Sequence, residues 1–142
     1  MCGSFLSGLF QRPSPFIDSK VAGPQVLRSE WTEIKVDKPL KPIGDRQQIS
    51  LYLTKPCRRD PWKPPGIPMP DGSYVLPELE TVTAEGLTVK WKYSGQRGAT
   101  SLTYRMEDES IKHEYVSIRV RADQEIPLEA IYWTGIVIKN MP

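Results

Sequence analysis

Histidine and cysteine are scarce in this 142-residue chain, which has one histidine, His113, and two cysteines, Cys2 and Cys57. The zinc and non-haem iron sites of proteins need several imidazole or thiolate ligands, so we expect no metal and no cofactor. A Ser-His-Asp triad would have to use His113, yet the sequence has no Gly-x-Ser-x-Gly elbow. His113 lies in the charged stretch 107–114 and is predicted to be a surface residue. Cys57 lacks a family signature that would pair it with His113, and the terminal position of Cys2 argues against a structural disulfide.

Long apolar runs and strong charge are missing as well. No stretch approaches the roughly 18 consecutive apolar residues of a membrane helix, and the apolar run 4–10 lacks the basic residues of a signal peptide. The formal net charge is only +2, and lysines and arginines are spread along the chain, so nucleic acid is not indicated as a partner. Residues 95–98 contain two glycines but no Walker lysine, and they lie between two predicted strands. A hairpin turn therefore explains them better than a phosphate loop.

Proline, in contrast, is abundant, and the apolar residues follow a strand pattern. The 14 prolines are about twice the usual share, and each fixes φ and removes an N–H, which argues against long helices. Apolar and polar residues alternate, as expected for strands with one buried face. Residues 130–138 are apolar on both faces, which predicts the centre of a sheet. The alternating segments are 32–36, 49–54, 87–93, 102–106 and 116–121, with shorter strands expected at 73–76 and 79–83.

These segments predict an all-β fold with seven to eight strands and little or no helix. The favoured architecture is an antiparallel two-sheet β-sandwich of immunoglobulin-like or jelly-roll-like type. Residues 1–26 are interpreted as an N-terminal tether or irregular arm. Residues 27–142 are interpreted as a single β-sandwich domain with a proline-rich loop at 55–72. An architecture used so widely does not by itself indicate a function.

The N-terminus carries a feature of its own. Residues 1–4, Met-Cys-Gly-Ser, precede a polar, proline-containing stretch and resemble the start of a mature bacterial lipoprotein. That resemblance implies that Cys2 is a lipid attachment site and that the protein is tethered to a membrane in the cell envelope or periplasm. A cytoplasmic protein with a chance cysteine is the alternative.

The proline-rich loop is the most unusual part of the sequence. Its proline density excludes regular strand or helix and predicts polyproline II and turns, which order at little entropic cost. An aromatic plane beside cations suits a sugar ring, an anionic headgroup, an acidic protein patch or single-stranded nucleic acid. Two other interpretations stay open, namely a lid over the core and a shield for a sheet edge. The predicted ligand-binding residues are Arg58, Arg59, Trp62 and Lys63.

The sequence supports three classes of function. The leading hypothesis is a non-enzymatic binding or protein-interaction module with a protein or glycan partner. The first alternative is a small carboxylate-based hydrolase acting on sugars, for which Glu78 with Glu80, or Glu107 with Glu109, would share a strand face. The second is a structural subunit of a larger assembly, which would expose an apolar patch involving residues 5–10.

Overall fold

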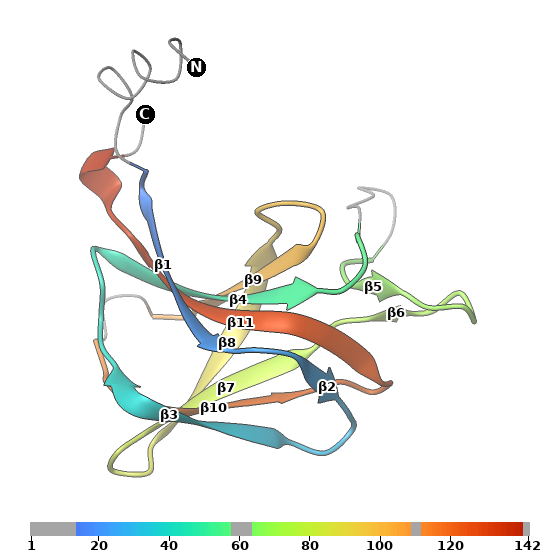
Figure 1. Cartoon of the computed structure of the whole chain (residues 1–142), viewed down its shortest axis with the longest axis horizontal. Coiled ribbons are helices and arrows are strands. Elements are labelled where there is room, and N and C mark those ends of the chain that lie inside the picture. The colour runs from blue at the N-terminus through green and yellow to red at the C-terminus, as the bar shows by residue number, and fades with distance from the viewer. Residues whose placement is uncertain (1–13, 58–63, 109–111, 141–142) are drawn as a thin grey trace, which may run out of the picture.

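The computed structural model describes residues 14–57, 64–108 and 112–140, and it contains strands joined by turns, with no α-helix in these segments (Figure 1). A single 3-10 turn at Ile138–Asn140 follows the last strand. In this part of the chain, no helix is long and apolar enough to cross a membrane. The strands are β1 (Phe16–Ala22), β2 (Gln25–Leu27), β3 (Thr32–Leu40), β4 (Arg46–Leu53), β5 (Ile67–Pro68), β6 (Tyr74–Val75), β7 (Glu78–Thr83), β8 (Thr88–Gly95), β9 (Ser101–Met106), β10 (Tyr115–Arg121) and β11 (Ile126–Ile136).

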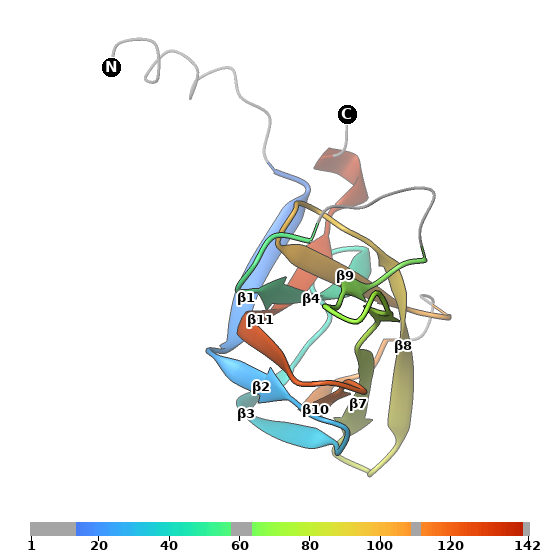
Figure 2. The same cartoon turned by 90° about the vertical axis from the view of Figure 1, so that its right-hand side faces the viewer.

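Nine of these strands form one sheet that curls into a nearly closed barrel. Their order is β1-β11-β4-β9-β8-β7-β10-β3, with β2 paired to β11, and all strand pairings are antiparallel. In Figures 1 and 2, β2 and β3 lie side by side, which brings the two ends of the strand order together. Register shifts interrupt the β8–β9, β10–β7 and β11–β4 pairings, and such bulges bend and twist a sheet.

The all-β, antiparallel prediction is confirmed, but the strands form one barrel-like sheet instead of the predicted two-sheet sandwich. Alternation along a strand shows that one face is buried. It carries no information on whether the facing side chains come from a second sheet or from the same sheet curled round, so both architectures fit the pattern.

The individual strand predictions hold for β3, β4, β6, β7, β8, β9 and β10, and β11 is central, with partners on both edges. Several predictions were wrong, and one of them is Ile138, which was assigned to the central strand but lies in the 3-10 turn after β11 and is 46% exposed. Residues Phe16–Ala22, assigned to the irregular arm, form β1 and pair with β11. Leu87, assigned to a buried strand face, lies in the turn before β8 and is 52% exposed.

Three aromatic side chains fill the middle of the barrel. The rings of Trp91, Tyr115 and Trp133 meet edge to face, with centroids 5.7 to 6.1 Å apart. Both indole N–H groups have an acceptor at 2.8 Å: Trp91 donates to Thr81 Oγ1 and Trp133 donates to the carbonyl of Lys41. Since a buried N–H without an acceptor is costly, these two bonds let tryptophan occupy the interior.

Candidate functional site

The residues predicted to bind a ligand, Arg58, Arg59, Trp62 and Lys63, lie outside the described residues, and so does the predicted lipid attachment site, Cys2. The structure does show the flanks of the proline-rich loop. Its described part contains a short strand, β5, where only irregular backbone was predicted, and β5 pairs with the predicted strand β6.

Cys57 fixes the base of this loop. Its side chain is buried, and its Sγ donates to the carbonyl of Gly66 at 3.3 Å, across the residues that separate them. Gln96 Nε2 in turn donates to the Cys57 carbonyl, which ties the loop to the β8–β9 turn. Burial raises the pKa of the Cys57 thiol, which keeps it in the unreactive form. Cys57 is therefore a structural residue here.

An open groove of about 540 Å³ lies beside this segment. One wall is the chain leaving β4, a second is β5 with the residues after it, and the third is the start of β11. The polar side chains of the described lining are those of Thr54, Lys55 and Glu125, and the rest are apolar. The lining residues are Leu53, Thr54, Lys55, Pro56, Ile67, Pro68, Met69, Pro70, Glu125, Ile126 and Pro127.

Three of the four carboxylates of the hydrolase hypothesis are held in ion pairs. Arg121 Nε contacts Glu78 at 2.5 Å, and Arg119 Nη1 contacts Glu80 at 3.2 Å. Glu107 pairs with Lys92, whereas Glu109 lies outside the described residues. Cross-strand ion pairs of this kind are a common way to stabilise a sheet surface.

A glycosidase-type general acid needs a carboxyl group with a raised pKa. The hydrogen bonds that Asp71 accepts from Ser73 lower the pKa of its carboxyl instead, and hydrogen bonds from its own backbone and from Thr83 lower that of Glu85. Across residues 14–57, 64–108 and 112–140, no group of three or more His, Cys, Asp or Glu side chains is placed to hold a metal ion. His113 packs near the ring of Tyr115, with centroids 6.0 Å apart.

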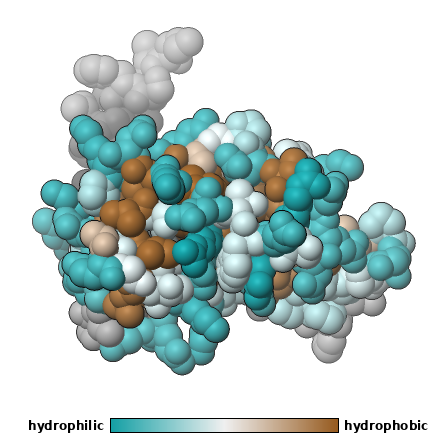
Figure 3. All heavy atoms as spheres, turned by 90° about the horizontal axis from the view of Figure 1, so that it is seen from below, coloured by the Kyte–Doolittle hydropathy of each residue, from teal (hydrophilic) through white to brown (hydrophobic). Residues whose placement is uncertain are grey.

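The exposed apolar side chains do not form one surface. The large exposed ones in the described chain are Ile17, Val26, Leu87 and Ile138, from four different parts of the fold. Figure 3 shows one face of the molecule, where hydrophilic residues divide the apolar ones into separate areas. Single exposed apolar residues are normal for a folded protein, and the apolar patch predicted for a structural subunit, residues 5–10, lies outside the described residues.

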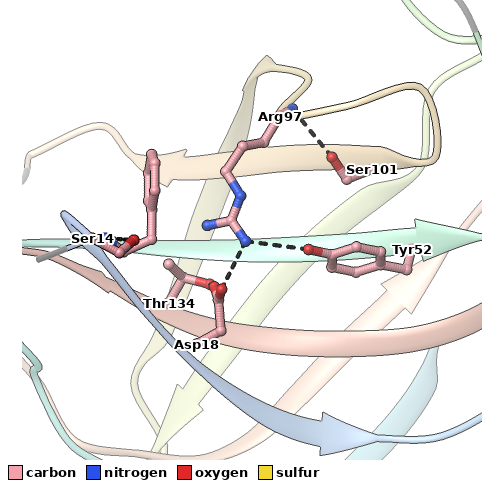
Figure 4. Close-up of polar contacts among 7 residues, drawn as sticks. Ser14, Asp18, Tyr52, Arg97, Ser101 and Thr134 are labelled. Atoms are coloured by element: carbon pink, nitrogen blue, oxygen red, sulfur yellow. Dashed lines mark hydrogen bonds and ion pairs between the residues drawn. The ribbon is translucent and has the colours of Figure 1, made fainter. Parts of the chain in front are cut away.

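A second unusual feature is a polar cluster on the outside of the sheet, centred on Arg97 (Figure 4). Arg97 comes from the β8–β9 turn and reaches over β9 and β4. Its Nη2 donates to Asp18 Oδ2 of β1 at 2.8 Å and to the hydroxyl of Tyr52 of β4 at 3.2 Å. Its guanidinium lies over the ring of Phe16, 4.4 Å from the centroid. Thr134 of β11 donates to the other Asp18 oxygen at 2.6 Å, so one carboxylate joins three elements of the fold.

Two cavities adjoin the residues of this cluster. One, of about 210 Å³, is lined by Arg97 together with parts of β4, β8 and β9. The other, of about 300 Å³, is lined by Asp18, Lys20, Tyr52 and residues of β11. The sequence showed Arg97 only as part of a hairpin turn. Its ion pair joins residues 79 positions apart, and no local pattern reports such a contact.

The pKa of Asp18 is lowered in this cluster. Burial alone raises it, but the hydrogen bonds from Arg97 and Thr134 and the charge of Arg97 outweigh burial. A carboxyl whose pKa falls on folding stabilises the folded state above its unfolded pKa of about 4, and that stabilisation is lost as the pH falls through the folded value. The Arg97–Asp18 pair should therefore stabilise the folded state at neutral pH, and this stabilisation should be lost in acid.

The variant Asp18→Asn tests this pH dependence of stability. At neutral pH it should melt at a lower temperature than wild type, because Arg97 is left without its counter-charge. The two melting temperatures, followed by circular dichroism from about pH 7 to pH 2, should converge below about pH 4. Other titrating groups are common to both proteins and cancel in the difference. A gap that stays constant with pH would show that Asp18 does not act through its charge.

No protein-family model, curated protein or solved structure matches this chain, so its function has to be inferred from the geometry of its own surfaces.

Proposed function

We propose that this protein is a non-enzymatic interaction module that binds an extended, apolar segment of a partner protein in the groove beside the proline-rich loop. The observation that carries the proposal is the 540 Å³ groove and its mainly apolar lining. Binding sites are typically concave and apolar, with a few polar groups that orient the ligand. An open groove of this kind suits a peptide better than a sugar, because a sugar needs many hydrogen-bonding side chains.

The backbone of the groove is stiff. Four prolines line it, Pro56, Pro68, Pro70 and Pro127, and each has a fixed φ. Their neighbours lose little conformational freedom when a ligand binds, which improves affinity without further contacts. Lys55 and Glu125 add one charge of each sign, and such charges orient a peptide and select for sequence.

A peptide library displayed on phage is a suitable probe, because the partner sequence is not needed in advance. Wild type is expected to select peptides with spaced apolar residues, and Met69→Glu should weaken the selected peptide at least about tenfold, because the peptide would have to cover a carboxylate. Lys55→Glu, at an exposed position, should alter which peptide charges are selected.

Leu87→Glu is the matched control, because it adds the same charge at an exposed apolar residue away from the groove. It should bind like wild type. Failure to select any peptide, or equal affinity for Met69→Glu and wild type, would contradict the proposal. A collapse of the melting temperature in both Met69→Glu and Lys55→Glu would show instead that this segment is a lid on the core.

The residues Arg58, Arg59, Trp62 and Lys63 connect Cys57 to Pro64 in the sequence, and we propose them as further contacts for the same peptide. The double variant Trp62→Ala/Arg58→Ala, measured with the same selected peptide, addresses this point. The lipid tether through Cys2 stays a prediction, and membrane partitioning of the natural gene product would decide it.

A further inference from the structure

We propose that the cavity beside Arg97 is an oxyanion site that binds a phosphate or sulfate group. This site is distinct from the groove and does not rest on the peptide-binding proposal. The lining combines two arginines with hydroxyl and amide side chains, and its described part contains no carboxylate. The lining residues are Phe16, Gln48, Ser94, Gly95, Gln96, Arg97, Thr103, Arg105 and Ile136.

Arg97 has an unused donor at this place. Its Nη2 is committed to Asp18 and Tyr52, whereas its Nη1 is buried and has no hydrogen-bond partner among the described residues. A buried N–H without an acceptor costs free energy, and in native proteins it usually indicates a missing water or ligand. An anionic oxygen entering the cavity is the strongest acceptor that a guanidinium can receive.

The second arginine is oriented before any ligand arrives. With its side-chain amide turned so that the oxygen faces Arg105, Gln48 accepts from both Nε and Nη2 of Arg105 at 3.0 Å. Gln48 is itself 4% exposed, so this support is fixed in the sheet. A guanidinium held in one orientation loses little entropy on binding, and its positive charge attracts the oxygens of a phosphate or sulfate.

Hydroxyl groups complete the cavity. Ser94 and Thr103 lie on neighbouring strands with their side-chain oxygens 3.2 Å apart. The hydroxyl of Thr103 also donates to the carbonyl of Gly95 at 2.9 Å, which fixes this side chain in the cavity wall. A volume of about 210 Å³ holds several water molecules, each of which needs about 30 Å³, so a tetrahedral oxyanion fits with room for the group that carries it.

Arg121 supplies a comparison within the same molecule. Its guanidinium lies 4.2 Å from the centroid of the Trp31 ring, and it pairs with Glu78, just as Arg97 combines Phe16 with Asp18. The cavity at Arg121 is larger, about 460 Å³, but its three cations, Lys90, Lys92 and Arg121, are balanced by three carboxylates, those of Glu78, Glu80 and Glu107. An arginine beside an aromatic ring is therefore not enough for an anion site, and the surrounding charge separates the two cavities.

The test is a titration of the full chain with inorganic phosphate, sulfate and acetate, each followed by calorimetry and by NMR of the arginine side-chain N–H groups. Saturable binding of phosphate, sulfate or both is expected, with the Arg97 and Arg105 signals shifting, and acetate should bind more weakly. Comparing phosphate with sulfate identifies which of the two groups the site prefers. Equal affinity for acetate would overturn the proposal of a tetrahedral oxyanion, and the absence of saturable phosphate or sulfate binding would overturn the site itself.

Two variants distinguish binding at this specific site from non-specific attraction of anions to the positive charge of the protein. Arg105→Gln should weaken binding about tenfold or more, because a charge-assisted contact is lost, while Arg105→Lys should recover part of it. Arg121→Gln removes the same charge at the comparison cavity and should bind like wild type. Equal weakening by Arg105→Gln and Arg121→Gln would contradict the proposal. Melting temperatures confirm folding, and if Arg105→Gln does not fold, Arg105→Lys must show the weakened binding.

Discussion

Replacing Trp133 with alanine is expected to lower the free energy of unfolding by about 3–5 kcal/mol, the usual cost of removing a large buried aromatic side chain. Trp133 is 1% exposed and its ring contacts those of both Trp91 and Tyr115. The substitution would remove two aromatic contacts and leave a cavity in the middle of the barrel. It would also leave the carbonyl of Lys41 without its donor. Urea unfolding at 25 °C, followed by circular dichroism, measures the change.

Trp31→Ala is the matched control, because it is the same substitution at a partly exposed position. Trp31 stacks against Arg121 at the surface, and a cation–π contact of this kind is worth about 0.5–1 kcal/mol. A cost for Trp31→Ala equal to that for Trp133→Ala would mean that the central aromatic cluster does not dominate the stability of the barrel.

The strands that the sequence predicts well are those with one apolar and one polar face. In β10, for example, Ile118 and Val120 are fully buried while Arg119 between them is half-exposed. β1 lacks this contrast, because Asp18, Ser19 and Lys20 follow one another in its middle. Its strand state comes from pairing with β11, more than a hundred residues away in the chain. A local pattern cannot report that partner.

The candidate sites were also difficult to predict, because they are formed by residues that lie far apart in the sequence. The proline-rich loop could be identified from composition, because proline acts locally on the backbone. The groove beside it also needs the start of β11, which lies far along the chain from β4 and β5. The Arg97 cluster is less visible still, since its members Asp18, Tyr52 and Thr134 are individually ordinary strand residues. Only the sheet order places them next to one another.

Gly135→Ala is expected to destabilise the fold by about 3 kcal/mol, although it adds only one methyl group. A Cβ at position 135 would clash with the carbonyl oxygen of Ile43 and lie 2.5 Å from the Ile43 Cβ. Because the obstacle includes backbone, a change of rotamer cannot relieve it. The segment around Ile43 is itself fixed, since the Ile43 N–H donates to Gln47 Oε1 at 2.8 Å and Asp45 N donates to the carbonyl of Ile136 at 2.7 Å.

The control for this prediction is Gly98→Ala, because a Cβ at Gly98 would meet no atom within 4 Å. It should leave stability unchanged or raise it slightly, since alanine restricts the unfolded chain more than glycine does. If Gly135→Ala acts by displacing the segment at Ile43, it should also disturb the nearby bond from Trp133 to Lys41, and the indole N–H of Trp133 should shift in the NMR spectrum. Equal stability of the two variants would contradict the prediction. It would show that the segment around Ile43 can move away from a Cβ at position 135 at little cost in free energy.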